Sequence, residues 1–286
     1  MKLGGGVKNQ SLKSTIGNWC DEMKIRNYTI NSKGEIDVDG NVWLENRDFK
    51  ELPYKFGEVN GDFSLNSNPN LTSLKNCPDK VGGYFSCSEC TKLDSLEGCP
   101  NDVGKAFTCI GCTNLKSLKG CPEKLHASFN CSDCINLKSL EYGPKIVEGN
   151  FVCNSCTNLK SLKGCPQKVE WNFSCSKCKN LESLEGCPEK IEYFSCDDCE
   201  KLESLVGCPS VVNGGFDCSY CISLKSLEGS PYSVGKSFYC FGCKSVDSLE
   251  GCPKEVNGVF DCSGCKRKFT KAEVSSLCTV GGRIKL

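Results

Sequence analysis

The sequence predicts a mainly β solenoid of the α/β type: a curved stack of about eleven coils with a parallel sheet on one face. Three observations predict this fold class. Cys-x-x-Cys pairs recur at a step of 22 residues with a single step of 21, a phenylalanine stands two places before each pair, and Leu-x-Ser-Leu follows most pairs. A fixed period of this length is typical of stacked repeats. The pairs begin at Cys87, Cys109, Cys131, Cys153, Cys175, Cys196, Cys218, Cys240 and Cys262.

Residues 1–39 are expected to cap the start of the stack. Four apolar residues within residues 14–25 recur at helical spacing and predict a helix. They are Ile16, Trp19, Cys20 and Met23. The stretch NYTINSKGEIDVDG at 27–40 has the alternation and turn residues of a β-hairpin. Helix and hairpin together are expected to cover the first coil.

Each coil of residues 40–265 is expected to contain one short strand, a bend, a return segment and a turn. In Phe-x-Cys the two named residues point to the same side of a strand, because side chains alternate with a period of two. Leu-x-Ser-Leu returns apolar residues to the core, and Gly-Cys-Pro turns the chain because proline cannot continue a ladder. No coil buries its apolar side alone, so the coils must stack.

Residues 266–286 are expected to cap the end of the stack. Thr270 and Glu273 have the spacing of a capping box, which predicts a short helix after Thr270. That helix is expected to lay Val274, Leu277 and Cys278 over the last coil.

One coil retains the frame without the cysteine pair. The stretch GDFSLNSNPNLTSLKNCPDKV at 61–81 has Leu65 in place of the first cysteine and Asn68 in place of the second. The pair is therefore not what builds the coil.

The frame resembles the leucine-rich repeat, L-x-x-L-x-L-x-x-N/C-x-L, with Asn68 or Cys90 at the N/C position. It is similar, more narrowly, to the short leucine-rich repeat proteins of tailed bacteriophages, whose copies read F-x-C-S-x-N-x-L-x-S-L-x-G-C-P. The match spans about residues 40–265. The resemblance implies recognition of a protein partner rather than one reaction. A phage origin further implies interference with a bacterial host or defence protein in the host cytoplasm.

The cysteine pairs leave two interpretations open. Neighbouring pairs give C-x2-C-x18-C-x2-C, a spacing that fits a four-thiolate zinc site, so the alternative is a metal-binding or redox protein. Three observations count against a metal site. Sites built from two coils would impose a 44-residue alternation, which the sequence lacks; nine pairs leave one pair without a second pair to share a site; and one coil lacks the pair. A thiol is also a small apolar group with a weak hydrogen-bond donor. At the position of Asn68 it can therefore satisfy some of the backbone groups that an asparagine would bond at the bend. We expect buried free thiols, no metal and no cofactor.

Composition and motifs argue against several classes of function. The 35 basic and 35 acidic residues cancel, so neither nucleic acid nor a membrane surface is an expected partner. No segment has the apolar length of a secretory signal or a membrane span, which favours a soluble cytoplasmic protein. His126 is the only histidine, and no phosphate-binding glycine loop is present, so we expect no enzyme activity.

Binding is expected at positions that differ between coils, since the frame itself is used in packing. The outward strand positions are small or polar in early coils, as at Ser86, Ser88, Thr108 and Ser132. In later coils acidic and aromatic residues take these positions, which favours a basic protein partner, while a homo-oligomer stays open. The predicted partner-binding residues are Asp197, Asp198, Asp217, Tyr220, Tyr239, Phe241 and Asp261.

The return segments carry two groups of like charge, interpreted mainly as solvated stripes. The basic group is Lys116, Lys119, Lys138, Lys160 and Lys163. The acidic group is Glu182, Glu185, Glu203, Glu228, Asp247 and Glu250.

Overall fold

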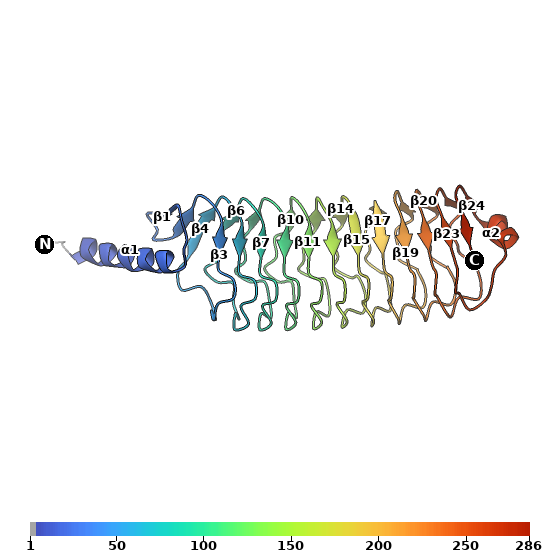
Figure 1. Cartoon of the computed structure of the whole chain (residues 1–286), viewed down its shortest axis with the longest axis horizontal. Coiled ribbons are helices and arrows are strands. Elements are labelled where there is room, and N and C mark those ends of the chain that lie inside the picture. The colour runs from blue at the N-terminus through green and yellow to red at the C-terminus, as the bar shows by residue number, and fades with distance from the viewer. Residues whose placement is uncertain (1–3) are drawn as a thin grey trace.

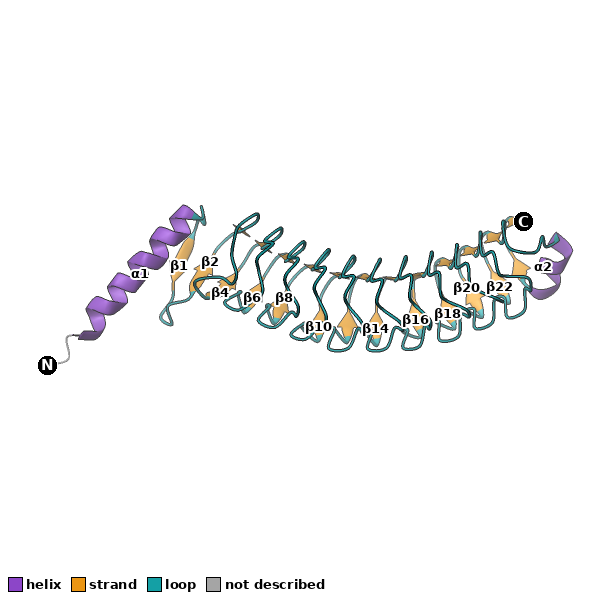
Figure 2. Ribbon diagram, turned by 90° about the horizontal axis from the view of Figure 1, so that it is seen from below, coloured by secondary structure: helices purple, strands orange, loops and turns teal. Residues whose placement is uncertain are grey.

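The computed structural model describes residues 4–286, with side chains from residue 10 onward, and has the predicted architecture of about eleven stacked coils. Figure 1 shows the coils side by side along one axis, with a helix at each end. The stack curves gently, and its longest sheet lies on the concave side (Figure 2). The predicted fold class, a mostly β parallel solenoid, is confirmed.

A twelve-stranded parallel sheet forms the concave face. Its strands contain two or three residues each, and phenylalanines of successive coils are register partners, as with Phe85 and Phe107. The strands are β3 (Val42–Trp43), β5 (Phe63–Ser64), β7 (Phe85–Ser86), β9 (Phe107–Thr108), β11 (Phe129–Asn130), β13 (Phe151–Val152), β15 (Asn172–Ser174), β17 (Tyr193–Ser195), β19 (Phe216–Asp217), β21 (Phe238–Tyr239), β23 (Phe260–Asp261) and β25 (Ile284–Lys285).

A second row of short strands, absent from the sequence prediction, lies on the convex side (Figure 2). In most coils it begins two residues after the proline of the turn. It is interrupted between β8 and β10 and between β14 and β16. The strands are β4 (Phe56–Val59), β6 (Lys80–Val81), β8 (Asp102–Val103), β10 (Lys124–Leu125), β12 (Ile146–Val147), β14 (Lys168–Val169), β16 (Lys190–Ile191), β18 (Val211–Val212), β20 (Ser233–Val234), β22 (Glu255–Val256) and β24 (Thr279–Val280).

The core is a set of parallel columns of identical or similar side chains. The phenylalanines of strands β5 to β23 are fully buried, and neighbouring ring centroids lie 4.9 to 6.1 Å apart. The first cysteine of each pair and the two leucines of the return segment are buried beside them. This matches the alternation expected from Phe-x-Cys and commits the frame to packing.

A helix and a hairpin precede the first coil. Helix α1 (Gly4–Glu22) packs by its last two turns, where Ile16 and Cys20 are buried. The Trp19 ring lies 6.2 Å from that of Phe56, so it extends the aromatic column. Strands β1 (Tyr28–Ile30) and β2 (Ile36–Val38) form the expected antiparallel hairpin.

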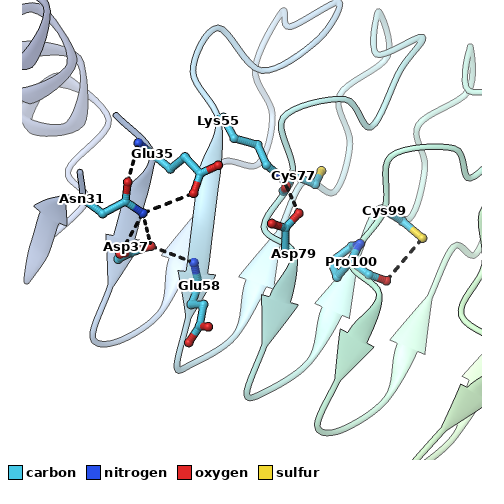
Figure 3. Close-up of polar contacts among 9 residues, drawn as sticks. All are labelled: Asn31, Glu35, Asp37, Lys55, Glu58, Cys77, Asp79, Cys99 and Pro100. Atoms are coloured by element: carbon cyan, nitrogen blue, oxygen red, sulfur yellow. Dashed lines mark hydrogen bonds and ion pairs between the residues drawn. The ribbon is translucent and has the colours of Figure 1, made fainter. Parts of the chain in front are cut away.

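Polar side chains fasten this hairpin to the first coil (Figure 3). Asn31 donates from Nδ2 to Asp37 Oδ2 at 3.1 Å, and its Oδ1 accepts from the backbone of Glu35 at 3.1 Å. Asp37 Oδ1 in turn accepts the Glu58 N–H at 3.0 Å. One coil further along, Lys55 Nζ donates to the Cys77 carbonyl at 2.6 Å and pairs with Asp79 at 2.7 Å.

The C-terminal helix α2 (Lys271–Leu277) begins with the predicted capping box of Thr270 and Glu273. Val274 and Cys278 are buried as expected, but Leu277 is 41% exposed. The expectation for Leu277 is wrong because a seven-residue helix turns that position away from the coil. Strands β24 and β25 follow and extend both rows of strands. Neither helix in the described range 4–286 is long and apolar enough to cross a membrane.

Candidate protein-binding surface

The seven residues predicted to bind a partner divide between two places. Five lie on the outward side of the twelve-stranded sheet, in or just after strands β17 to β23, toward the C-terminal end of the stack (Figure 1). They are Asp197, Asp217, Tyr239 and Phe241, which are partly exposed, and Asp261, which is only 6% exposed. Asp198 and Tyr220 instead occupy the bend after the strand, with φ angles of 58° and 57°. They border the concave face rather than lying on it.

Strand register brings the outward residues together. Asp217 in β19 is the register partner of Tyr239 in β21, which is the partner of Asp261 in β23. Adjacent strands of a sheet lie about 4.8 Å apart, so these three side chains form one column across neighbouring coils. Asp197 lies beside this column, two residues after Ser195, the register partner of Asp217. The sheet therefore gathers three carboxylates, Asp197, Asp217 and Asp261, which we call the acidic cluster.

Tyr193 belongs to this surface although the sequence analysis did not single it out. Its ring lies over Gly215 of the next coil, where an added Cβ would approach Cε2 of the tyrosine to 3.1 Å. Burial, and then the carboxylates of Asp217 and Asp197, raise the pKa of Tyr193 to about 12. The single 21-residue step between Cys175 and Cys196 removes a residue from the loop before Tyr193, and this irregular spacing was the available signal.

The members of the acidic cluster differ in their partners. Asp197 Oδ1 accepts from the hydroxyls of Ser195 at 2.7 Å and Ser176, and Asp261 Oδ1 accepts from Ser263 Oγ at 2.6 Å. Lys285 Nζ lies 3.4 Å from Asp261 Oδ2.

Asp217 is less well compensated than its neighbours. Its Oδ1 accepts the backbone N–H of Ser219 at 2.9 Å. Burial raises the pKa of the Asp217 carboxyl, Ser219 acts in the opposite direction, and the carboxylates of Asp197 and Asp261 raise the pKa further. The surface thus holds a partly buried negative charge that a cation would stabilise.

Ser219 lies directly beside Asp217 and is 1% exposed. Among the described side chains, its Oγ is the buried polar atom without a hydrogen-bond partner. Serines at the same position in other coils are bonded, as Ser263 is to Asp261 and Ser132 to Asn130 at 2.7 Å. The Ser219 side chain still lies close enough to Asp217 to lower the pKa of that carboxyl.

An aromatic pair stands at the edge of the same surface. The Tyr220 and Phe241 rings meet edge to face with centroids 4.8 Å apart, and Tyr220 is 49% exposed. Gly242 permits this arrangement, because an added Cβ there would come within 2.6 Å of the Tyr220 ring. Exposed aromatic rings of this kind commonly anchor protein interfaces.

Strands β5 to β15 present a different, uncharged surface at the equivalent positions. Ser86 and Thr108 join hydroxyl to hydroxyl at 2.7 Å, and Ser174 Oγ donates to Asn154 Oδ1 at 2.6 Å. These small groups hydrogen-bond one another along the stack, whereas the first coil has Trp43 in the same column and a carboxylate, Glu45, that accepts from Ser64 Oγ at 2.5 Å.

Comparisons with protein-family models, with curated proteins and with solved structures find no match for this chain. The function is therefore inferred from the surface itself.

The cysteines have defined places in the coils, and all 27 are free. The second cysteine of each pair donates from Sγ to a backbone carbonyl of the preceding coil, at 3.1 to 3.4 Å. Asn68 occupies the same position and donates to the Leu44 carbonyl at 2.8 Å. Burial raises the pKa of Cys99 and Cys165 to about 12, which keeps these thiols protonated near neutral pH. Across the described residues, no group of three or more His, Cys, Asp or Glu is placed to hold a metal ion.

The charged return segments are interleaved rather than separated by sign. Lys119 lies 2.9 Å from Glu97 of the preceding coil, and Lys160 lies 3.9 Å from Glu182 of the following one. These groups are exposed, and exposed ion pairs contribute little stability. The stripes therefore carry less net charge than the sequence alone indicated.

A groove of about 720 Å³ lies on the convex side, where β14 and β16 are not paired. Val169 and Ile191 line it, with Lys168 and Glu192 among its charged residues. The same 21-residue step explains the opening. In the regular coils the corresponding N–H bonds to the strand valine, leucine or isoleucine of the preceding coil, as Glu170 does to Val147. The Glu192 N–H instead bonds to the Trp171 carbonyl at 2.9 Å and not to that of Val169. The predicted partner-binding residues lie elsewhere.

Proposed function

We propose that this chain is a non-enzymatic binding module that recognises a basic segment of a protein partner through its concave face. The observation that carries the proposal is the concentration of acidic and aromatic side chains on one face between β17 and β23. From β5 to β15 the same positions hold uncharged side chains, several of which bond to each other, although the first coil carries Trp43 and Glu45 there. The buried side chains repeat from coil to coil, whereas the outward side chains differ between coils. The differences therefore lie on the surface that a partner would contact.

A narrower proposal concerns the class of partner. The repeat frame resembles that of short leucine-rich repeat proteins of bacteriophages, and this resemblance alone supports a bacterial host or defence protein as the target, bound in the host cytoplasm. We treat that target as part of the same proposal.

An affinity pull-down from bacterial lysate tests the function. The wild-type chain is compared with a triple variant, Tyr220→Ala, Tyr239→Ala and Phe241→Ala. We expect a partner that binds the wild type in stoichiometric amount and is lost from the variant, because aromatic anchors dominate interface energies. An unchanged set of bound proteins in the triple variant contradicts the proposed face. A matched control, Tyr142→Ala, removes an exposed tyrosine from the turn edge and should retain the partner.

A further inference from the structure

We propose that one side of the stack, here called the return face, binds the return face of a second copy of this chain in an antiparallel, two-fold symmetric dimer. The return face consists of the outward side chains of the six Leu-x-Ser-Leu segments between residues 116 and 228 and of the two residues after each segment. It is separate from the concave face, so this inference does not depend on the proposed function.

The charge of the return face changes sign at its middle. The three coils from 116 to 163 carry five lysines and one glutamate, whereas the three coils from 182 to 228 carry four glutamates and one lysine. All of these side chains are exposed. The basic half holds Lys116, Lys119, Lys138, Glu141, Lys160 and Lys163. The acidic half holds Glu182, Glu185, Glu203, Lys225 and Glu228.

Ion pairs within the chain leave this difference in place. Lys163 pairs with Glu141 inside the basic half at 3.9 Å, so that half keeps its excess of lysine. In the acidic half, Glu185 and Glu228 have no ion-pair partner among the described residues. The face therefore has a positive end and a negative end, which is a charge pattern that complements its own reverse.

A two-fold axis that crosses the face at the change of sign brings opposite charges together. Such an axis reverses the order of the coils but keeps each position within the coil. Lys160 then meets the partner's Glu182, and Lys163 meets the partner's Glu185. The same rotation makes each contact twice, as in any isologous dimer. A parallel arrangement would instead place like charges against each other.

Two exposed apolar side chains are the second, independent observation. Tyr142 is 69% exposed and Val206 is 56% exposed. Each departs from the repeat. Tyr142 has a φ of 65° at a position where the neighbouring coils have Gly120 and Gly164, and Val206 replaces the lysine or glutamate that other coils carry. A residue with a Cβ is strained at a left-handed position, so packing within the chain does not account for Tyr142.

The axis defined by the charges also brings these two side chains together. Tyr142 lies one coil before that of Lys160, and Val206 lies one coil after that of Glu182. Reversal of the coil order therefore places Tyr142 beside the partner's Val206. Apolar contact of this kind adds to the attraction of the charges and covers both exposed side chains.

The contact is small, which makes the dimer weak and reversible. It spans six coils at about 4.8 Å each. It ends there, because the next coils on the two sides would place Asp94 and Asp247 opposite each other. Lys138 adds little, since the partner's Glu203 is already paired with its own Lys225. We expect a dissociation constant on the order of tens of micromolar, and weaker association at high salt.

Sedimentation velocity at low ionic strength, with protein at tens to hundreds of micromolar, tests the dimer. The basic variant carries Lys160→Glu and Lys163→Glu, and the acidic variant carries Glu182→Lys and Glu185→Lys. Each variant alone should dimerise more than about tenfold more weakly than the wild type, because like charges then meet at both contacts.

An equimolar mixture of the two variants should dimerise again. In the mixed dimer one contact is native and the other has both charges reversed, so both are attractive. A variant that had merely lost its fold could not be rescued in this way. The control Lys190→Glu with Lys236→Glu makes the same charge change outside the return face and should dimerise like the wild type.

Tyr142→Gly tests the apolar contact separately. It restores the glycine of the repeat, so it should weaken the dimer severalfold without lowering thermal stability. The pull-down variant Tyr142→Ala should likewise weaken the dimer while it retains the partner bound to the concave face.

Four results would overturn the proposed dimer. They are a wild type that stays monomeric throughout, a mixture of the two charge variants that does not associate, a dimer that neither charge variant weakens, and association that continues beyond two copies. A dimer unchanged by Tyr142→Gly would overturn the proposed alignment of the two copies.

Discussion

The Sγ atom of Cys112 lies 3.1 Å from the carbonyl oxygen of Cys87 in the preceding coil. The same contact recurs at the second cysteine of every pair, and Asn68 makes it with an amide instead of a thiol. No backbone N–H of the described residues donates to the Cys87 carbonyl. The column of second cysteines therefore satisfies a row of buried carbonyls that the strands leave free.

Replacing one of these thiols should separate its two roles. Cys156 is fully buried and donates to the Cys131 carbonyl at 3.2 Å. Cys156→Ala leaves that carbonyl unpaired and opens a small cavity, so we expect a loss of about 1 to 3 kcal/mol in the free energy of unfolding. Cys156→Ser keeps a donor of similar size and should lose less. Urea denaturation measures both, and an alanine variant as stable as the serine variant would argue against the hydrogen bond.

The buried thiols should also set an upper pH limit on stability. Burial raises the pKa of Cys99, Cys165 and Cys208 to about 12, against an ordinary value of 9.0. A raised pKa of an acid means that the folded chain holds its proton longer than the unfolded chain. This contribution is complete below pH 9 and is lost as the pH rises toward 12, at up to about 1.4 kcal/mol per pH unit for each thiol.

We therefore expect constant stability from pH 7 to 8 and cooperative unfolding at higher pH. Thiolate absorbance near 240 nm and circular dichroism, followed together, should change at the same pH. Thiolate absorbance that grows while the circular dichroism stays native would contradict this prediction.

The bend between the two cysteines is a left-handed position in every coil that carries the pair. Gly111, Gly242 and Gly264 occupy it in three coils, while Lys177 holds φ 60° in another. A residue with a Cβ is strained there, so Lys177→Gly should raise the free energy of unfolding by about 0.5 to 1 kcal/mol. Gly111→Val should lower it by more than 1 kcal/mol on the same scale. Thermal denaturation tests both variants. Changes in the free energy of unfolding that have the same sign would contradict the prediction.

Periodicity was sufficient to predict the coil, but several features depend on the three-dimensional context. The 22-residue step and Phe-x-Cys alternation predict the stacked coils and the buried columns, because both follow from local geometry. The second row of strands was missed since its members, such as Lys80–Val81, have one inward residue each and show no alternation. The bend was predicted but its left-handed conformation was not, because Glu89, Ser155 and Lys177 are not residues that signal a positive φ.

The candidate site was predicted in part for a related reason. Position in the repeat placed Asp217, Tyr239 and Asp261 on one face, and strand register brings them together. Tyr193 was missed because its importance arises from the shortened coil and from the space above Gly215. The unpaired hydroxyl of Ser219 depends on side-chain geometry that no spacing rule contains.

The last strand of the concave sheet makes a prediction about self-association. β25 ends the sheet, so the outer backbone groups of Ile284 and Lys285 have no strand partner in the part of the chain that the structure describes. At the opposite end, β3 is also an edge strand, and its Trp43 is 53% exposed. Pairing of one copy's β25 with another's β3 would continue the stack without closing, which generates filaments.

Exposed charge at the C-terminal edge opposes this pairing. Arg283 precedes β25, and charged residues are a common protection of sheet edges. Arg283→Thr removes that charge and adds a residue that favours strands, while the ion pair between Lys285 and Asp261 is kept. We expect concentration-dependent association of this variant in sedimentation velocity, with larger species than the wild type forms. Lys138→Thr removes the same charge from a return segment away from both ends and should sediment like the wild type. Identical sedimentation of the two variants would mean that Arg283 does not protect the edge.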